Sequence, residues 1–88
     1  MTITVQLDKS IEAFVAHQAQ EQQISPEAAL AELVQMGFEA KLRELHSRYI
    51  RGEYSFGRLA KELGSTTWEL THLLEERGLQ VHNLPLAA

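Results

Sequence analysis

The first seven residues alternate between polar and apolar side chains. Polar residues stand at positions 2, 4 and 6, and apolar residues, two of them β-branched, stand at positions 3, 5 and 7. This period of two predicts a half-buried β-strand. Apart from the short stretch 79–81, the chain offers no other strand candidate that could pair with its N–H and C=O groups. We therefore expect residues 2–7 of two copies to pair antiparallel about a two-fold axis.

Apolar residues at helical spacing follow this predicted strand. Asp8 suits the N-cap position of a helix over residues 9 to about 22. Ser25, with proline directly after it, predicts the start of a second helix that continues until Gly52. Gly37 interrupts this helix, and it either permits a close helix crossing or weakens the helix by about 1 kcal/mol relative to alanine.

Two short helices are predicted in the last third of the chain. Ser55 caps a helix over residues 56–63, Gly64 turns the chain, and Thr66 caps a further helix that ends near residue 77. Glu69 stands three residues after Thr66, which is the spacing of a capping box. Two capped helices joined by a tight turn with glycine predict a helix-turn-helix unit.

The order strand, helix, capped helix resembles the ribbon-helix-helix DNA-binding fold, in which a two-stranded ribbon enters the major groove. The resemblance implies that Thr2, Thr4 and Gln6 meet base edges, and that the helix start at Ser25 binds phosphate. We also assign Lys9 to DNA contact. Many such ribbons carry Arg or Lys, whereas this one is uncharged. The alternative interpretation is a strand whose outer face is only in contact with solvent.

The charge is segregated along the 88 residues, whose net charge is −4. Residues 1–40 hold one base against six acids, residues 41–61 hold six bases against two acids, and residues 62–88 hold one base against four acids. The basic middle is compatible with nucleic-acid contact through Arg58 and Lys61. It is equally compatible with the solvated basic face of a helix.

The composition and the motifs of the chain exclude several kinds of site and of protein. The chain has no cysteine, which excludes a disulfide framework, a thiolate zinc site and a cysteine nucleophile. We see no signal peptide and no apolar run of about 20 residues, so we expect a cytoplasmic location and no membrane contact. No catalytic triad or glycine-rich phosphate loop is present, and we expect no enzyme, cofactor or metal site. Glu69, His72 and Glu76 have a spacing used by metal sites in helical bundles, but they face away from the apolar stripe of their helix.

Two motifs in the last 41 residues resemble a prokaryotic family of predicted helix-turn-helix antitoxins. The stretch from Tyr49 to Ala60 is similar to the family core Y-x-x-G-x-x-S-x-G-x-x-A, and the stretch from Trp68 to Gly78 matches W-E-x-x-x-L-L-x-x-R-G. The resemblance covers about residues 2–82. It implies a homodimeric regulator that binds its own operator DNA and neutralises a toxin, typically a PIN-domain ribonuclease.

The last predicted helix departs from a DNA-reading helix because its carboxylates repel phosphate groups. We therefore assign DNA contact first to the N-terminal strand, and partner binding to four residues of the C-terminal lobe: Trp68, His72, Glu75 and Glu76. Packing of Trp68 on Phe56 or Tyr54 in the core is the competing interpretation. The alternative function is an adaptor that dimerises and masks a partner without binding DNA.

The predicted fold is thus mostly α-helical, with an N-terminal β-strand paired between subunits. Residues 1–51 would form a ribbon-helix-helix-like dimerisation and DNA-binding region. Residues 52–82 would form a helix-turn-helix-like lobe, and residues 83–88 a tail.

Overall fold

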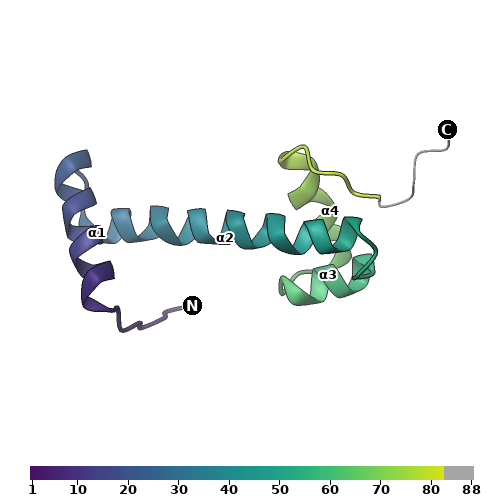
Figure 1. Ribbon diagram of the computed structural model, residues 1–88, viewed down its shortest axis with the longest axis horizontal. Helices are drawn as coiled ribbons and strands as arrows, with labels where there is room; N and C mark the ends of the chain where they lie inside the picture. Colours follow the sequence, from purple (N-terminus) through teal and green to yellow (C-terminus); the bar gives the residue numbers. More distant parts are fainter. Residues whose placement is uncertain (83–88) are drawn as a thin grey trace. The chain divides into compact units, whose positions relative to one another are not determined.

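The computed structural model describes residues 1–82, and this part of the chain contains four helices (Figure 1). They are α1 (Lys9–Gln22), α2 (Pro26–Ile50), α3 (Phe56–Glu62) and α4 (Thr67–Glu76). The chain divides into two compact units, and the boundary between them along the sequence falls within α2. Unit 1 comprises Met1–Phe38 and unit 2 begins at Glu39. The predicted tail over residues 83–88 lies outside the described residues.

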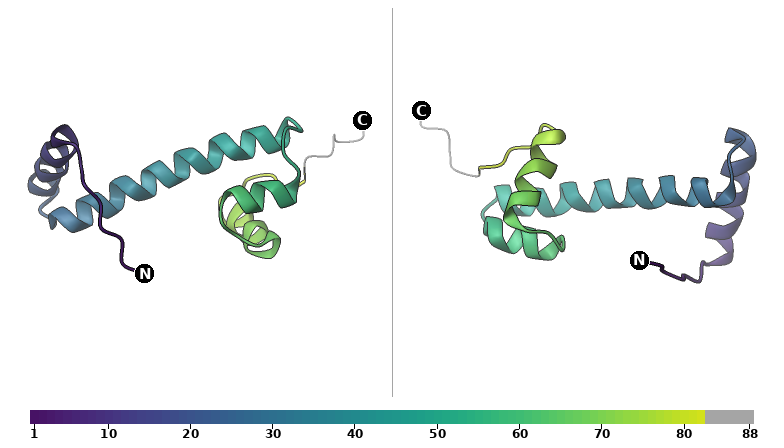
Figure 2. Two further views of the ribbon diagram at one scale, coloured as in Figure 1. Left: turned by 90° about the horizontal axis from the view of Figure 1, so that it is seen from below. Right: turned by 180° about the vertical axis from the view of Figure 1, so that it is seen from behind.

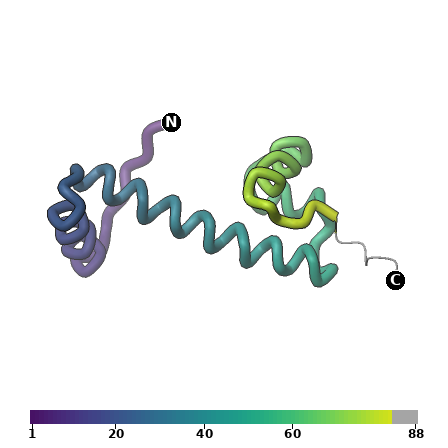
Figure 3. Tube along the Cα trace, turned by 90° about the horizontal axis from the view of Figure 1, so that it is seen from above, coloured from purple at the N-terminus to yellow at the C-terminus, as the bar shows by residue number. Residues whose placement is uncertain are grey.

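The predicted N-terminal strand is wrong, because residues 1–82 contain no β-strand. Residues 2–7 form an extended segment that precedes α1 and is drawn in purple in Figure 3. Alternating β-branched residues favour extended backbone, but a strand exists only where a neighbouring segment accepts its backbone hydrogen bonds. No part of the described chain does so. The ribbon expected to present Thr2, Thr4 and Gln6 is therefore absent, and the fold is helical throughout.

Unit 1 consists of the extended segment, α1 and the first part of α2. Its buried core is Val15, Ala19 and Ala29, with Ile24, Leu30 and Leu33 partly buried around it. The turn between the helices is made by Gln23, which adopts the left-handed conformation at φ 56°. Ser25 then starts α2, and its Oγ accepts a hydrogen bond from the Ala28 amide at 3.1 Å.

Asp8 stands at the N-cap of α1, but it does not cap the helix with its side chain. Its carboxylate accepts a hydrogen bond from the Ser10 hydroxyl at 2.9 Å instead. The predicted helix therefore begins where expected, while its first amides lack the side-chain acceptor that the sequence suggested.

Unit 2 contains the larger core. The helices α3 and α4 lie side by side and cover the C-terminal part of α2 in both views of Figure 2. Seven residues of these three helices are buried together: Leu42, Leu45, Tyr49, Leu59, Ala60, Leu70 and Leu74. Phe56 completes the packing, since its ring meets the Tyr49 ring edge-on with centroids 5.5 Å apart.

The connection from α3 to α4 is a helix-turn-helix built from local hydrogen bonds. The Ser55 Oγ accepts from the Arg58 amide at 3.0 Å and thereby starts α3. Gly64 turns the chain at φ +67°, a backbone conformation that residues with a Cβ rarely adopt. Thr66 then caps α4. The helix-turn-helix is therefore determined by hydrogen bonds between residues that are close together in the sequence.

The segment after α4 folds back onto α2. The Tyr49 hydroxyl donates to the Val81 carbonyl at 2.6 Å. The His46 Nε2 lies 2.7 Å from the Gln80 carbonyl, and because a carbonyl only accepts, this ring nitrogen carries the hydrogen. Leu79 and Val81 pack against the core of unit 2 at the same place. The polar groups of a nearly buried histidine and a buried tyrosine are thereby satisfied.

Candidate functional site

Helix α4 has one face in the core of unit 2 and one face in solvent. Leu70 and Leu74 are fully buried on the inner face. Trp68 lies on the outer face with 70% of its surface exposed, and its ring meets the His72 ring edge-on with centroids 4.3 Å apart. The interpretation of Trp68 as a core residue packed on Phe56 or Tyr54 is therefore wrong.

A shallow depression of about 280 Å³ lies on this outer face, and it joins apolar to acidic side chains. It is lined by Trp68, Glu69, His72, Leu73 and Glu76. Glu75 is also exposed on the same helix. The α4 face, which we define as Trp68, Glu69, His72, Glu75 and Glu76, thus combines a large aromatic ring with three carboxylates.

Glu69 is fixed in position by the capping box at the start of α4. The Thr66 Oγ1 accepts from the Glu69 amide at 3.1 Å, and a Glu69 carboxylate oxygen accepts from the Thr66 amide at 2.9 Å. The hydrogen bond from the Thr66 backbone lowers the pKa of Glu69 below its ordinary value. The negative charge at this end of the α4 face therefore persists at mildly acidic pH.

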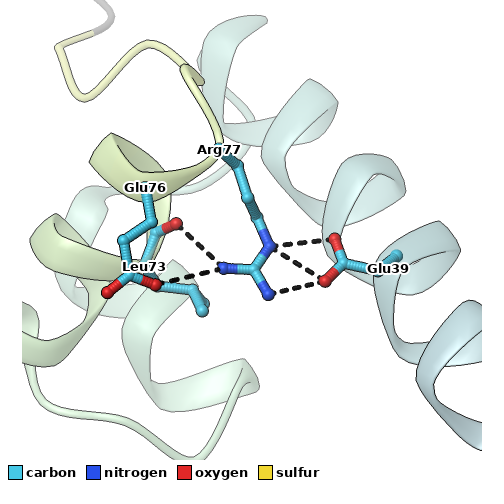
Figure 4. A network of polar contacts seen from close by, with 4 residues as sticks. All are labelled: Glu39, Leu73, Glu76 and Arg77. Atoms are coloured by element: carbon cyan, nitrogen blue, oxygen red, sulfur yellow. Dashed lines mark hydrogen bonds and ion pairs between the residues drawn. The ribbon is translucent and has the colours of Figure 1, made fainter.

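Arg77 borders the other end of the face, but it is turned toward α2 (Figure 4). Its Nε and NH2 groups donate to the two carboxylate oxygens of Glu39 at 2.6 to 2.9 Å. Its NH1 group donates to the Leu73 carbonyl at 3.2 Å and lies 3.8 Å from the Glu76 carboxylate. Because the Glu39 carboxylate binds the Nε and NH2 groups of Arg77, the positive charge of Arg77 only partly offsets the negative charge of the α4 face.

The Glu39–Arg77 pair is also an electrostatic link within unit 2. Its side chains are 30% and 22% exposed, so solvent screens it less than a surface pair. The hydrogen bond from Arg77 lowers the pKa of Glu39, and the same bond raises the pKa of Arg77. Both groups are therefore ionised across the neutral range, and the pair joins α2 to the C-terminal end of α4.

The residues predicted to bind DNA are divided between the two units. Thr2, Thr4, Gln6 and Lys9 are exposed in unit 1, and the Ser25 hydroxyl is occupied by the α2 cap. Arg58 and Lys61 belong to α3 in unit 2. Arg58 pairs with Glu62 at 2.9 Å and lies over the Tyr54 ring at 4.9 Å from its centroid, while Lys61 is exposed.

Most bases of the basic middle have partners in their own unit. Lys41 pairs with Glu44 at 3.3 Å and Arg51 pairs with Glu53 at 2.8 Å. Arg48 donates to the Tyr54 hydroxyl at 2.9 Å, and this bond raises its pKa. Three of the six bases between residues 41 and 61 thus have a carboxylate partner within unit 2, which partly offsets their attraction for phosphate.

The Glu39–Arg77 pair and the two carbonyl contacts of His46 and Tyr49 were not predicted from the sequence. The partners are 38, 34 and 32 residues apart, so no local spacing could have connected them. The only available signal was Arg77 itself, which lies in the motif that ends at Gly78.

In the described part of the chain, no three His, Asp or Glu side chains are close enough together to hold a metal ion. No helix within residues 1–82 has the length and apolar character needed to cross a bilayer. Comparison of this chain with protein-family models, with curated proteins and with solved structures finds no match.

Proposed function

We propose that this chain is a non-catalytic regulatory protein that binds another protein through the α4 face. The observation that carries this proposal is the exposure of Trp68, the single tryptophan of the chain, on a helix whose other large apolar residues are buried or partly buried. Tryptophan is enriched among the residues that dominate binding energy in protein interfaces. Nothing in the described structure requires the Trp68 ring to be exposed for folding.

The chemistry of the α4 face favours a basic partner surface. Glu69, Glu75 and Glu76 attract Lys and Arg side chains, and the face of an indole ring attracts a guanidinium group. The nearest base is Arg77, and its Nε and NH2 groups are hydrogen-bonded to Glu39. A ribonuclease has a basic surface that binds RNA, so an antitoxin that masks a ribonuclease toxin fits both this chemistry and the family resemblance. The expected cytoplasmic location remains part of this proposal.

The proposal is tested by co-expressing the chain with the product of the neighbouring reading frame and measuring affinity and relief of toxicity. We expect Trp68→Ala to weaken the complex by about 30-fold or more, because a hot-spot residue contributes about 2 kcal/mol or more. The double change Glu75→Gln and Glu76→Gln should slow association, since it removes charge from the face.

The matched control removes two exposed carboxylates from unit 1, by Glu21→Gln and Glu27→Gln. This control changes the net charge equally and should leave affinity unchanged. If Trp68→Ala binds as tightly as the unchanged chain, with its helical content intact, the α4 face is not the binding site. If no complex forms at all, this neighbour is not the partner and the toxin-masking version of the proposal fails.

A second candidate function is operator binding, which the helix-turn-helix of α3 and α4 favours. The carboxylates of α4 oppose it, so phosphate contact would rest on Arg58 and Lys61 of α3. A gel shift on the upstream DNA at several salt concentrations tests this candidate. Arg58→Ala with Lys61→Ala should then reduce affinity and the salt dependence, whereas Thr4→Ala with Gln6→Ala should not. A chain that shifts no DNA even at low salt excludes this second function.

A further inference from the structure

The depression on the α4 face has an apolar residue on each side and an acidic residue at each end. Successive residues of a helix are about 100° apart around its axis. Trp68 and His72 therefore lie along one side of the depression and Leu73 lies on the other, while Glu69 and Glu76 lie between them. Since Glu69 and Glu76 are seven residues apart, they are separated by about 10 Å along the helix. The depression thus runs along α4 from one carboxylate to the other.

The Trp68 ring combines a defined position with a large exposed area. Its edge-on contact with the His72 ring joins two residues that are one turn apart on α4. Even with this contact, 70% of the Trp68 surface is exposed. On the opposite side of the depression, Leu73 is partly buried against the core of unit 2. An incoming side chain therefore meets an aromatic ring on one side and an aliphatic one on the other.

Glu69 is the carboxylate that shares the first turn of α4 with Trp68. One of its oxygens accepts a hydrogen bond from the Thr66 amide at 2.9 Å, which fixes the side chain at the start of the helix. A carboxylate has about four acceptor sites, so Glu69 can accept further hydrogen bonds. Glu76, at the other end, lies 3.8 Å from the Arg77 NH1 group, which partly offsets its charge. Glu69 is therefore the stronger acceptor of the two for an incoming cation.

The size and chemistry of the depression fit one cationic side chain. Its volume of about 280 Å³ lies just below the range of roughly 300–1,000 Å³ that is usual for small-molecule pockets. An aromatic ring face attracts a cation, and a carboxylate beside it strengthens that attraction. Arginine suits this pair better than lysine, because its planar guanidinium is weakly hydrated, stacks on aromatic rings and holds its donors in one plane. The lysine ammonium is a compact and strongly hydrated charge.

We infer that the depression binds one arginine side chain of the partner protein, with the guanidinium stacked on the Trp68 ring and hydrogen-bonded to the Glu69 carboxylate. The methylene groups of the arginine lie against Leu73. This inference rests on the function proposed for the α4 face, because it names the group of the partner that this face recognises. It also divides the acidic residues of the face, since Glu75 does not line the depression.

The test is a titration of the full chain with two blocked tripeptides, acetyl-Gly-Arg-Gly-amide and acetyl-Gly-Lys-Gly-amide, which carry the same charge. The chain has one tryptophan, so its single indole N–H resonance reports on Trp68 by NMR. At about 0.15 M salt, where charges far from the site are screened, we expect the arginine peptide to shift this resonance saturably. Its dissociation constant should be at least about fivefold lower than that of the lysine peptide. Equal affinity for the two peptides, or a shift that does not saturate, overturns the inference.

Three substitutions on α4 locate the bound guanidinium. Glu69→Gln keeps a capping-box side chain but removes the charge, and it should weaken binding of the arginine peptide by about fivefold or more. Glu75→Gln is the matched control on the same helix and should change the affinity by less than about twofold. Trp68→Leu keeps an apolar side chain but removes the aromatic face, so the preference for arginine should disappear, as measured on the backbone amide resonances of α4. Circular dichroism checks that each variant keeps its helices.

Equal losses in Glu69→Gln and Glu75→Gln contradict the inference, because they indicate a general attraction of cations to the helix. An arginine preference that survives Trp68→Leu contradicts it as well. The peptide titration needs no partner protein, so its outcome is separate from that of the proposed function. If a partner protein binds the α4 face while the peptides show no preference, the inference fails and the proposed function stands. If the peptides behave as expected while no partner complex depends on Trp68, the arginine site stands and the proposed function fails.

Discussion

The two units of this chain differ in how much of their stability they supply themselves. Unit 2 buries seven residues from three helices, four of them leucines with no exposed surface. Unit 1 buries one valine and two alanines, and it leaves larger side chains such as Phe14 and Met36 in solvent. Both units contain well-formed helices, so helix formation alone does not make a folded core. Unit 2 thus has a core of large side chains, whereas the core of unit 1 consists of small ones.

The largest expected effect comes from cavities made in the two cores. Leu70→Ala in unit 2 should cost about 2–5 kcal/mol, because Leu70 is fully buried among α2, α3 and α4. Val15→Ala in unit 1 should cost about 1–2 kcal/mol, since it removes two methyl groups from a small core. Urea unfolding followed by circular dichroism measures both, and amide exchange shows which helices open. Equal costs for the two substitutions would remove the contrast between the units.

An intermediate effect is expected at the Glu39–Arg77 pair of unit 2. The pKa of Glu39 is lower in the folded chain than in the unfolded chain, because Arg77 stabilises the carboxylate. The stabilisation is therefore complete above the unfolded value of about 4.3 and is lost as the pH falls through the lowered folded value. Thermal unfolding of Glu39→Gln between pH 2 and 7 should show a lower midpoint at pH 7 and a weaker loss on acidification than the unchanged chain.

The matched control is Glu32→Gln, which removes an exposed carboxylate from the unit 1 part of the same helix. It should leave the acid dependence close to that of the unchanged chain. If Glu39→Gln retains the full acid dependence, the pair does not link α2 to α4 in solution.

The smallest effects are expected at Gly64 and Gln23, two of the left-handed residues that connect helices. Gly64→Ala puts a Cβ into the turn of unit 2 at φ +67° and should cost about 1–2 kcal/mol. Gln23→Gly relieves the same conformation in unit 1 and should gain up to about 1 kcal/mol. Thermal melts of the two variants measure these opposite shifts. A loss of stability in Gln23→Gly would mean that the glutamine side chain contributes something that the left-handed turn does not explain.

The helix starts could be predicted from the sequence because their causes are local. Ser25, Ser55 and Thr66 each accept a hydrogen bond from an amide three residues later, and each lies just before a helix. The capping partner is within one turn, so the sequence contains both members of the pair. Asp8 is the exception, because the nearby Ser10 hydroxyl takes its carboxylate.

The failures concern features that depend on distant partners. Residues 2–7 have the polar and apolar alternation of a strand. This alternation does not specify a neighbouring segment that would form the backbone hydrogen bonds of a sheet. Trp68 lies on the outer face of α4, because Leu70 and Leu74 occupy the face that packs into the core. The Glu39–Arg77 pair joins positions 38 residues apart. In each case the residue type was visible in the sequence, whereas its surroundings were decided by packing.

The two carbonyl contacts made by His46 and Tyr49 have a practical consequence for experiments on this chain. They fasten the backbone at Gln80 and Val81 to α2, so this end of the described chain is held in place. A fluorescent label or fusion partner joined directly after His82 starts from that anchored position. One joined ahead of Thr2 instead hangs on an extended segment that is exposed on its way to α1. Distance measurements will therefore be sharper from a label placed directly after His82 than from one placed ahead of Thr2.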